Sequence, residues 1–216
     1  MKKVTLFLLL GLSLTTLLIS TPLAAQTPDE IVQKMSEQMD RGDEEGFTMD
    51  MNMKMPIIGT VGAHSLVRGD KVRMEMNAKD RSEIAWRDAT TKWTYNTLTG
   101  EVTIEPREAS SSEGAAADKA DLSTFDRITE GYTLHLQKET ADAWYILCKK
   151  ARTNKDKDDP KKMELAVAKA TYLPIYLRMK KSFITVSIEN VTIGVSEEEV
   201  TFNPADYPNA KIIDKR

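Results

Sequence analysis

Hydrophobic and polar positions follow two periods along the chain, first one of about 3.6 residues and then one of two. Near the beginning, Ile31, Met35 and Met39 recur at intervals of four, as on one face of an amphipathic helix. The run Thr27-Pro28-Asp29-Glu30 supplies an N-cap residue, Pro at the first helical position and Glu three residues after the cap. We therefore predict an amphipathic helix that begins after Thr27 and ends near Gly42.

The most regular alternation lies in residues 48–55, where every odd position is Met and every even position is polar. Successive side chains of a strand point to opposite faces of a sheet. A strand here would therefore place four thioethers on one face, those of Met49, Met51, Met53 and Met55. Two more strands are predicted at 60–68 and 71–76, joined by a tight turn at Gly69-Asp70, and the second adds Met74 and Met76 to one face.

The period of two continues through most of the rest of the chain. It predicts strands at 83–87, 92–96, 101–105, 132–138, 144–152, 163–169, 172–180 and 183–195, and a terminal strand around 199–202. In the strand at 172–180, Leu173, Ile175 and Leu177 are expected to line one face. In 183–195 the apolar positions change parity, which predicts a β-bulge near Glu189-Asn190.

These elements predict a mainly β protein with a few helices, built on a single large curved antiparallel sheet. A sheet of about ten strands must close, split into two layers or be covered. Residues 106–124 break the strand pattern and form a long loop, with a short helix expected at 122–129. We expect the N-terminal helix and this central helical loop to cover the apolar face.

The first 25 residues have the composition of a signal peptide. Lys2 and Lys3 precede the apolar run 4–19, and Leu23-Ala24-Ala25 offers small residues at a cleavage point before Gln26. The apolar run has 16 residues, fewer than the roughly 20 that a membrane-spanning helix needs. We therefore divide the chain into a signal peptide at 1–25 and one exported domain at 26–216.

Charge and cysteine content narrow the classes of partner and chemistry. The 216 residues carry a net charge of −3, so no clustered excess of Lys and Arg favours nucleic acid as a partner. The single thiol, Cys148, follows Ile146 and Leu147 and is expected to be a buried structural residue. With one cysteine the chain forms no internal disulfide, and its stability must come from packing.

No catalytic or metal-binding motif stands out. His64 and His135 lie far apart on predicted strands, and neither belongs to a known catalytic pattern. The acidic residues of 156–159 suit a solvated turn better than a calcium loop, and those of 197–199 suit a helical turn capped by Ser196. We expect no cofactor, no metal and no enzymatic activity; a hydrolase that uses a carboxylate or His64 is the least favoured reading.

Methionine usage is the most unusual feature of the sequence. Met is unbranched and polarizable, and it is over-used on surfaces that bind differently shaped apolar partners. One reading is that the four alternating Met residues of 48–55 fill the core beneath a helix. The other is that they form the pliable wall of a cavity for flexible hydrocarbon chains.

The order of these features resembles the bacterial lipoprotein-localisation carrier (LolA) family, also described as outer-membrane lipoprotein carriers or lipoprotein-sorting proteins. The resemblance rests on the signal peptide, the opening helix, the strand at 71–76, the segments 93–96 and 101–104, and a closing Phe-x-x-Pro-like segment at 200–209. It covers nearly all of the chain after residue 25.

The resemblance implies an unclosed β-barrel, or half-barrel, whose concave apolar face is covered by helices and holds acyl chains. It also implies a periplasmic carrier of lipid or lipoprotein acyl chains, with an inner-membrane transporter as donor and an outer-membrane protein as acceptor. No nucleotide site is expected in such a carrier. Arg68, Arg73 and Arg87 are all candidates for the family's lid-latching Arg. The same half-barrel serves stress sensors that bind a regulatory protein, which leaves a periplasmic sensor or interaction protein as the alternative.

The residues expected to contact acyl chains share an apolar character and one side of the predicted sheet or its covering helix. We expect a monomer whose lipid-binding residues are Ile31, Met35, Met39, Met49, Met51, Met53, Met55, Met74, Met76, Leu173, Ile175 and Leu177.

Overall fold

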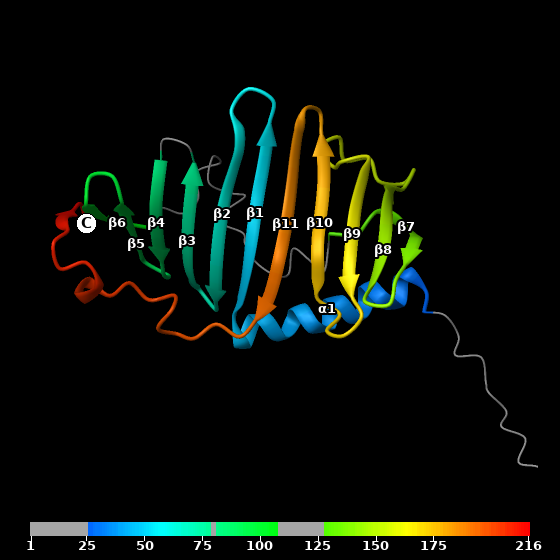
Figure 1. Ribbon diagram of the computed structural model, residues 1–216, viewed down its shortest axis with the longest axis horizontal. Coiled ribbons are helices and arrows are strands. Elements are labelled where there is room, and N and C mark those ends of the chain that lie inside the picture. Colours follow the sequence, from blue (N-terminus) through cyan, green and yellow to red (C-terminus); the bar gives the residue numbers. More distant parts are fainter. Residues whose placement is uncertain (1–25, 79–80, 108–127) are drawn as a thin grey trace, which may run out of the picture.

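The computed structural model describes residues 26–78, 81–107 and 128–216, in which an α-helix lies along one end of a large curved sheet (Figure 1). The helix is α1 (Pro28–Glu45), and a short 3-10 helix, η1 (Pro204–Asp206), follows near the C-terminus. The strands are β1 (Phe47–Met55), β2 (Gly59–Arg68), β3 (Lys71–Ala78), β4 (Arg81–Arg87), β5 (Thr91–Asn96), β6 (Glu101–Pro106), β7 (Tyr132–Glu139), β8 (Ala143–Lys150), β9 (Lys162–Ala168), β10 (Pro174–Lys181), β11 (Ile184–Ile193) and β12 (Lys211–Asp214).

The sheet is a single open one, as the sequence predicts. Its strand order is β12-β6-β5-β4-β3-β2-β1-β11-β10-β9-β8-β7, so β12 and β7 are free edges. The pairing of β1 with β11 joins two meanders, β1 to β6 and β7 to β11. These eleven strands pair antiparallel, whereas β12 runs parallel to β6, so the sheet is mixed rather than wholly antiparallel.

The predicted terminal strand at 199–202 is wrong. Residues 197–200 form a turn in which the Ser196 hydroxyl accepts a hydrogen bond from the Glu199 backbone N–H at 3.3 Å, so the predicted Ser196 cap is confirmed. The Glu199 carboxylate in turn accepts from the Ser196 backbone N–H at 2.7 Å. The Ser196 hydroxyl also donates to this carboxylate at 2.7 Å, and the two hydrogen bonds that the carboxylate accepts lower the pKa of Glu199. The last strand, β12, begins only at Lys211.

The predicted helix is confirmed at its start and extends further than expected at its end. The Thr27 hydroxyl accepts from the Glu30 backbone N–H at 3.2 Å, and the Glu30 carboxylate accepts from the Thr27 backbone N–H at 2.8 Å. This is the reciprocal capping box that the sequence predicts. Gly42 stays within the helix, and Gly46 caps its C-terminus at φ 78, where the absence of a Cβ favours glycine.

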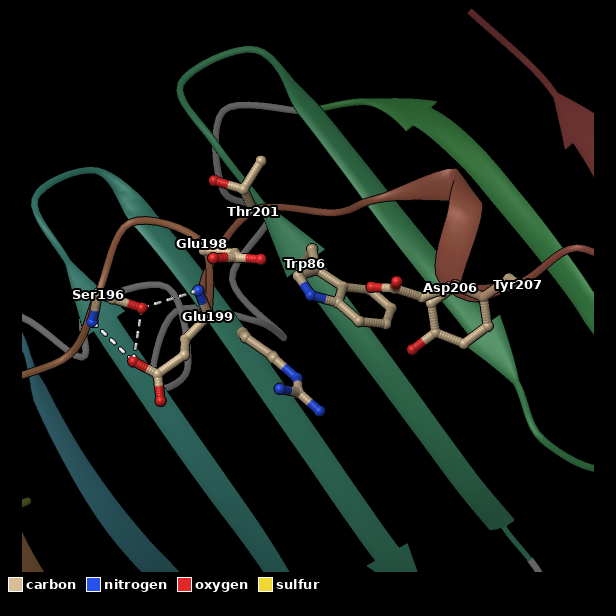
Figure 2. Close-up of a pocket in the computed structure, with 8 residues that line it drawn as sticks. Trp86, Ser196, Glu198, Glu199, Thr201, Asp206 and Tyr207 are labelled. Atoms are coloured by element: carbon tan, nitrogen blue, oxygen red, sulfur yellow. Dashed lines mark hydrogen bonds between the residues drawn. The ribbon is translucent and has the colours of Figure 1, made fainter.

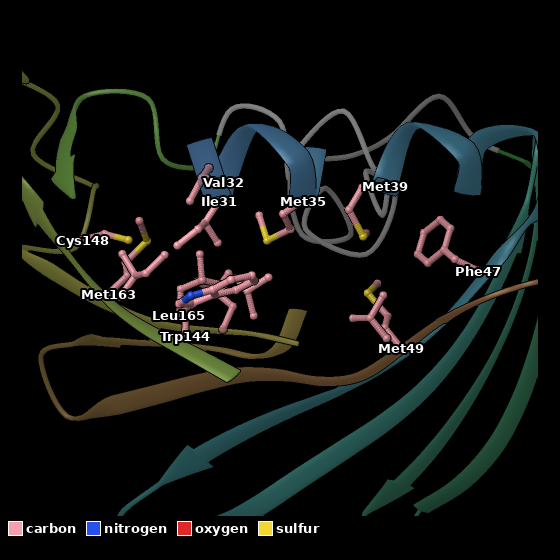
Figure 3. Close-up of a cluster of buried hydrophobic side chains, with 14 of the residues drawn as sticks. Ile31, Val32, Met35, Met39, Phe47, Met49, Trp144, Cys148, Met163 and Leu165 are labelled. Atoms are coloured by element: carbon pink, nitrogen blue, oxygen red, sulfur yellow. The ribbon is translucent and has the colours of Figure 1, made fainter. Parts of the chain in front are cut away.

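The main hydrophobic core lies between α1 and the sheet (Figure 3). The buried stripe of the helix faces side chains from β1 and from β8 to β11, with Trp144 and Leu165 among them. Cys148 is fully buried in this core, as predicted. The cluster comprises Ile31, Val32, Met35, Met39, Phe47, Met49, Val67, Val72, Trp144, Ile146, Cys148, Met163, Leu165, Val167, Leu177 and Val191.

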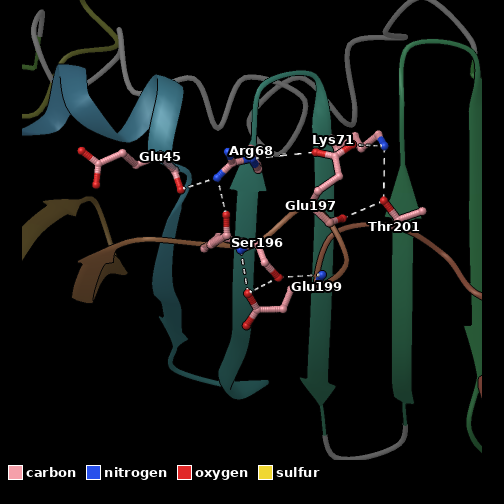
Figure 4. A network of polar contacts seen from close by, with 8 residues as sticks. Glu45, Arg68, Lys71, Ser196, Glu197, Glu199 and Thr201 are labelled. Carbon is pink, nitrogen blue, oxygen red and sulfur yellow. Dashed lines mark hydrogen bonds and ion pairs between the residues drawn. The ribbon is translucent and has the colours of Figure 1, made fainter.

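The end of α1, the start of β1, the end of β2 and the exit of β11 meet at Gly46. The Gly194 backbone N–H donates to the Gly46 carbonyl, and the Val195 backbone N–H donates to the Glu45 carbonyl, both at 2.9 Å. Arg68 donates from Nη1 to the carbonyl oxygens of Glu45 and Val195, at 2.8 and 2.6 Å (Figure 4). Because α1 has no basic residue in its last turn, Arg68 supplies the cation that its C-terminal carbonyl groups favour.

A second apolar contact covers the opposite face of the sheet. The segment after β11 crosses β2 to β5, where Val195 and Val200 bury Leu66. Further along, Phe202 stacks on Trp93 with ring centroids 5.8 Å apart and meets Trp86 edge-on at 5.3 Å. The closing segment named in the sequence resemblance therefore anchors the C-terminal part of the chain to the sheet.

Two predicted features fall outside the described residues: the signal peptide at 1–25, and the central helical loop, of which residues 108–127 are not described. The predicted β-bulge near Glu189-Asn190 is confirmed. The register of β1 against β11 shifts between Thr48 and Asp50, and Asn190 has φ 55.

We expect Gly46→Ala to lower the free energy of unfolding by about 2 to 4 kcal/mol, because the new Cβ would be strained at positive φ and would meet Val195 Cβ at 2.8 Å. Gly69→Ala is the matched control. Gly69 also has positive φ, at 56, but nothing lies within 4 Å of the position that a Cβ would occupy there, so its cost should be about 1 kcal/mol. Urea denaturation of both variants measures the difference, and equal losses would contradict the crowding at Gly46.

We expect the Cys148 thiol to be unreactive in the folded protein. Burial raises its pKa to about 11, and the reactive species is the thiolate. At pH 8 a chromogenic disulfide should therefore react only as fast as the protein unfolds, and at once in denaturant. Rapid reaction of the native protein would show that the α1 core opens without global unfolding.

Candidate functional site

All ten Met residues in the described part of the chain lie on the α1 side of the sheet or on α1 itself. On the strands this follows from the register: Met51 pairs with Ala63, which pairs with Met76, while Met53 pairs with Val186, which pairs with Met179. We call this surface the methionine face. Its strand residues are Met49, Met51, Met53, Met55, Met74, Met76, Met163 and Met179, and its helical residues are Met35 and Met39.

One part of the methionine face is closed by the helix. Met35, Met39, Met49 and Met163 are buried in the α1 core, and Met51 packs against its margin. Ile31, also predicted to contact lipid, is fully buried there too. For these residues the structure agrees with the reading in which Met fills the space beneath a helix.

The other part extends beyond the helix core, and we call it the outer methionine strip: Met53, Met55, Met74 and Met76. None of the four belongs to the buried cluster, and Met53 keeps 36% of its surface exposed. The half-buried Val61 and Val186 flank Met53 on either side as its direct partners on β2 and β11. The strip therefore offers an apolar surface of flexible side chains that the α1 core does not use.

The same sheet face becomes polar toward β4, β5 and β6. Met76 on β3 pairs with Glu83 on β4, which pairs with Asn96 on β5. In the same way, Met74 pairs with Ala85, which pairs with Thr94. The apolar surface thus has a border at β3. This border makes the outer methionine strip a bounded patch rather than one part of a uniformly apolar face.

Ile175 is the predicted site residue that the structure places elsewhere. The pairing of β10 with β9 shifts register between Pro174 and Tyr176, so Ile175 leaves the face that carries Leu177 and is 43% exposed. Leu177 is buried in the α1 core and Leu173 packs against it. The expectation that the three residues share one face failed because a bulge changes the parity of a strand without any change in the alternation of residue types.

A pocket of about 270 Å³ lies on the other face of the sheet, between β3, β4 and the segment after β11 (Figure 2). Trp86 and Tyr207 provide its aromatic side, and Arg73 lies over the Trp86 ring at 5.7 Å. Its remaining lining is polar and mainly acidic: Ser196, Glu198, Glu199, Thr201 and Asp206. This lining does not suit a hydrocarbon chain, which separates the pocket from the methionine face.

Sequence reasoning missed this second face. Its signal was present in the alternation of residues 93–96, where Trp93 and Tyr95 occupy one parity and polar residues the other. The rings of Tyr95 and Tyr207 lie 4.5 Å apart and join the cluster around Phe202. Apolar residues at alternate positions of a strand indicate that one face of the sheet is covered, but they do not indicate which of the two faces it is.

Of the three candidate latch residues, Arg68 contacts the helix, through the Glu45 carbonyl. Arg73 donates to Glu75 at 2.5 Å, and its Nε atom is buried without a hydrogen-bond partner among the described residues. Arg87 lies on the α1 side of β4, where it pairs across the sheet with Val72. Arg68 therefore ties one covering element, α1, to the sheet.

His64 has a partner that the sequence did not reveal. Its Nδ1 lies 2.6 Å from Asp50 Oδ1, and Asn190 donates to the other oxygen of the Asp50 carboxylate at 2.7 Å. Burial raises the pKa of Asp50, but the hydrogen bonds from Asn190 and His64 outweigh it and hold that pKa below its usual range. The pair lies on the face opposite the methionines, and its side-chain hydrogen bonds in the described part involve no hydroxyl or thiol nucleophile.

Other sequence candidates remain dispersed. His135 is exposed on the edge strand β7, and the acidic turn at 156–159 is tied by Lys181 and Asn154, which contact Asp158 and Asp159. Over the ranges that the structure describes, no group of three or more His, Cys, Asp or Glu residues is arranged to hold a metal ion. No helix within those ranges combines the length and apolarity needed to cross a membrane.

Comparison with known proteins supports the fold. No protein-family model matches the sequence, and no curated protein matches it. Among solved structures, LprF from Mycobacterium bovis matches with a TM-score of 0.50 and 11% identity, over 82% of this chain and 98% of that one. A LolA superfamily protein from Nitrosomonas europaea matches with a TM-score of 0.34 and 12% identity, over 84% and 100% of the two chains.

A third match is MucB, solved in complex with MucA(peri), with a TM-score of 0.44 and 12% identity over 82% of this chain and 60% of that one. Identities this low concern the fold alone. The likeness to LprF supports the arrangement described above, a mainly β protein with an open curved sheet. The description of the Nitrosomonas europaea protein names the family that the sequence resembles.

We expect the two parts of the methionine face to differ in their contribution to stability. Met39→Ala should lower the free energy of unfolding by about 2 to 5 kcal/mol, because it leaves a cavity in the α1 core. Met53→Ala should lower it by less than about 1 kcal/mol, because this side chain is already partly exposed. Urea denaturation measures both, and an equally large loss for Met53→Ala would make the outer strip part of the core.

Proposed function

We propose that the protein is a non-catalytic periplasmic carrier that holds an acyl chain against the outer methionine strip. The single observation that carries the proposal is the division of the methionine face, with one part buried beneath α1 and the other only partly buried. A protein that used Met solely as core filler would have no need for four more on the same face beyond its core. Proteins rarely keep contiguous apolar surface open without a binding role.

Methionine suits such a surface for a physical reason. Its unbranched thioether side chain changes rotamer easily and so adapts to the different bends of a hydrocarbon chain. Burial of each CH₂ group contributes roughly 0.8 kcal/mol, so ten methylenes would contribute about 8 kcal/mol before ordering costs are subtracted. Binding of this kind would hold a lipid during transit and still allow its release.

The position of α1 limits how cargo could exchange. The buried stripe of the helix and the Arg68 contacts fix it to the sheet, so removal of the whole helix would disrupt the main core. The outer strip instead leads to the end of the sheet where the β1–β2 turn lies, away from α1 (Figure 1). We propose that acyl chains enter and leave at this end, with an inner-membrane transporter as donor and an outer-membrane protein as acceptor.

We expect the double variant Met53→Asp, Met76→Asp to lose most of its acyl binding while it remains folded, because each carboxylate would have to be desolvated against the hydrocarbon. Binding is measured by titration of a fluorescent fatty acid and by native mass spectrometry of protein isolated without detergent. The wild type should carry lipid that organic extraction removes.

The matched control is Asn52→Asp, Asn77→Asp, which adds the same charge to neighbouring positions of β1 and β3 on the opposite face. This control should bind the fatty acid like the wild type. Undiminished binding by the Met53, Met76 variant would contradict the proposal. A second result would also contradict it: a wild-type protein that carries no lipid but co-purifies with a stoichiometric protein partner. If the Met53, Met76 variant lost that partner, the result would favour a sensor.

A further inference from the structure

Two adjacent turns expose large apolar side chains almost completely. Ile57 is 98% exposed and Ile58 is 68% exposed, both in the turn between β1 and β2, and Phe183 is 64% exposed in the turn between β10 and β11. Turns of this kind usually carry polar residues, because their side chains remain in water. Three bulky apolar side chains here contribute nothing to the core.

The register brings these turns together. β1 and β11 are paired, with Lys54 opposite Thr185, so the turn that follows Met55 lies beside the turn that precedes Ile184. Both turns lie at the upper end of the sheet in Figure 1, opposite the end that α1 covers. We call Ile57, Ile58 and Phe183 the hairpin-tip patch. It adjoins the outer methionine strip, since Met53 and Met55 lead directly into the first of the two turns.

The charge around the patch is opposite in sign to that of the whole chain. Residues 51–62 and 177–188 contain four basic residues and no acidic one, in a chain with a net charge of −3. Lys181 is paired with Asp158 at 2.7 Å. Lys54 and Lys180 are exposed and make no ion pair within the described residues, so their charges are available to an anionic surface.

Exposed apolar side chains flanked by lysines form the combination that binds the surface of an anionic membrane. The apolar groups enter the boundary between headgroups and acyl chains, and the lysines contact the anionic lipids. A protein partner would also cover apolar groups. However, a cluster of convex turn tips offers no groove or flat face to a folded domain, whereas a bilayer accepts protruding side chains individually.

We infer that the hairpin-tip patch docks on an anionic phospholipid bilayer, with Ile57, Ile58 and Phe183 in the headgroup region and Lys54 and Lys180 against the lipid phosphates. In this orientation the open end of the outer methionine strip faces the membrane and α1 faces away from it. The inference of docking depends only on the residues of the two turns and the lysines beside them. Its use, as the place where an acyl chain passes between bilayer and carrier, rests on the proposed function.

Flotation with vesicles tests the inference. The wild-type protein is purified after export. It is then mixed with vesicles of equimolar phosphatidylglycerol and phosphatidylcholine and, separately, with vesicles of phosphatidylcholine alone. We expect it to float with the anionic vesicles, and less so as salt is added. The triple variant Ile57→Ser, Ile58→Ser, Phe183→Ser should lower the bound fraction roughly tenfold or more, because it removes the apolar contacts.

Ile175→Ser is the matched control, because it removes an exposed apolar side chain at the beginning of β10, remote from the tips. It should float like the wild type. Lys54→Gln, Lys180→Gln should weaken binding to the anionic vesicles and reduce the salt dependence, and this variant serves as the test if the triple variant does not fold. All variants must have the same N-terminus, verified by intact mass.

Flotation of the triple variant at the wild-type level would overturn the inference. The inference would also be overturned if the wild-type protein bound neither kind of vesicle, or if it formed a dimer and the triple variant were a monomer. Fatty-acid titration without vesicles separates the two proposals. The triple variant should bind the fatty acid normally, and the Met53→Asp, Met76→Asp variant should still float, so the failure of either proposal leaves the other standing.

Discussion

A wide open sheet has two faces, and the apolar core on each face must be covered by some other element of the chain. This constraint governs the molecule. The helix α1 covers one face across β1 and β8 to β11, while the segment after β11 covers the other face across β2 to β5. The two covers meet at Gly46 and Arg68, where the Arg68 guanidinium binds the Glu45 and Val195 carbonyl groups together. The junction explains how a sheet with two free edges can hold both covers in place.

Much of the fold could be predicted from local patterns, because those patterns have local causes. The capping box around Thr27, the turn at Gly69, the shared face of Met49 and Met51 and the bulge near Asn190 all follow from a few neighbouring residues. The prediction failed at Ile175, because a shift in strand pairing changes which face of the sheet a residue occupies. It also failed at Phe202, whose position depends on aromatic partners that are distant in sequence, on β4 and β5. The parallel β12 could not be foreseen, since nothing in its four residues names β6 as the partner.

The sequence predicted most residues of the methionine face, but not which of them are buried beneath α1 and which are partly exposed. Alternation assigns Met49 and Met53 to a common apolar side, and it carries no information on where the helix ends and solvent begins. That border depends on the position of α1 along one end of the sheet, where it contacts β7, β11 and β2 (Figure 1). The exposed turn residues Ile57 and Phe183 were missed for a related reason, because a turn has no period from which burial can be inferred.

Stability and adaptability are therefore separated along the strands. At the α1 end, β-branched and aromatic side chains such as Val167 and Trp144 surround the buried methionines, and such stiff partners hold one arrangement. At the opposite end, methionines face no such partners within the core cluster, so their rotamers can follow a guest without any change in the core. A carrier needs both properties at once, since binding energy drawn from the core would weaken the fold each time the cargo left. If the protein acts as the proposed carrier, placing the flexible side chains beyond the helix would allow cargo to leave without loss of structure.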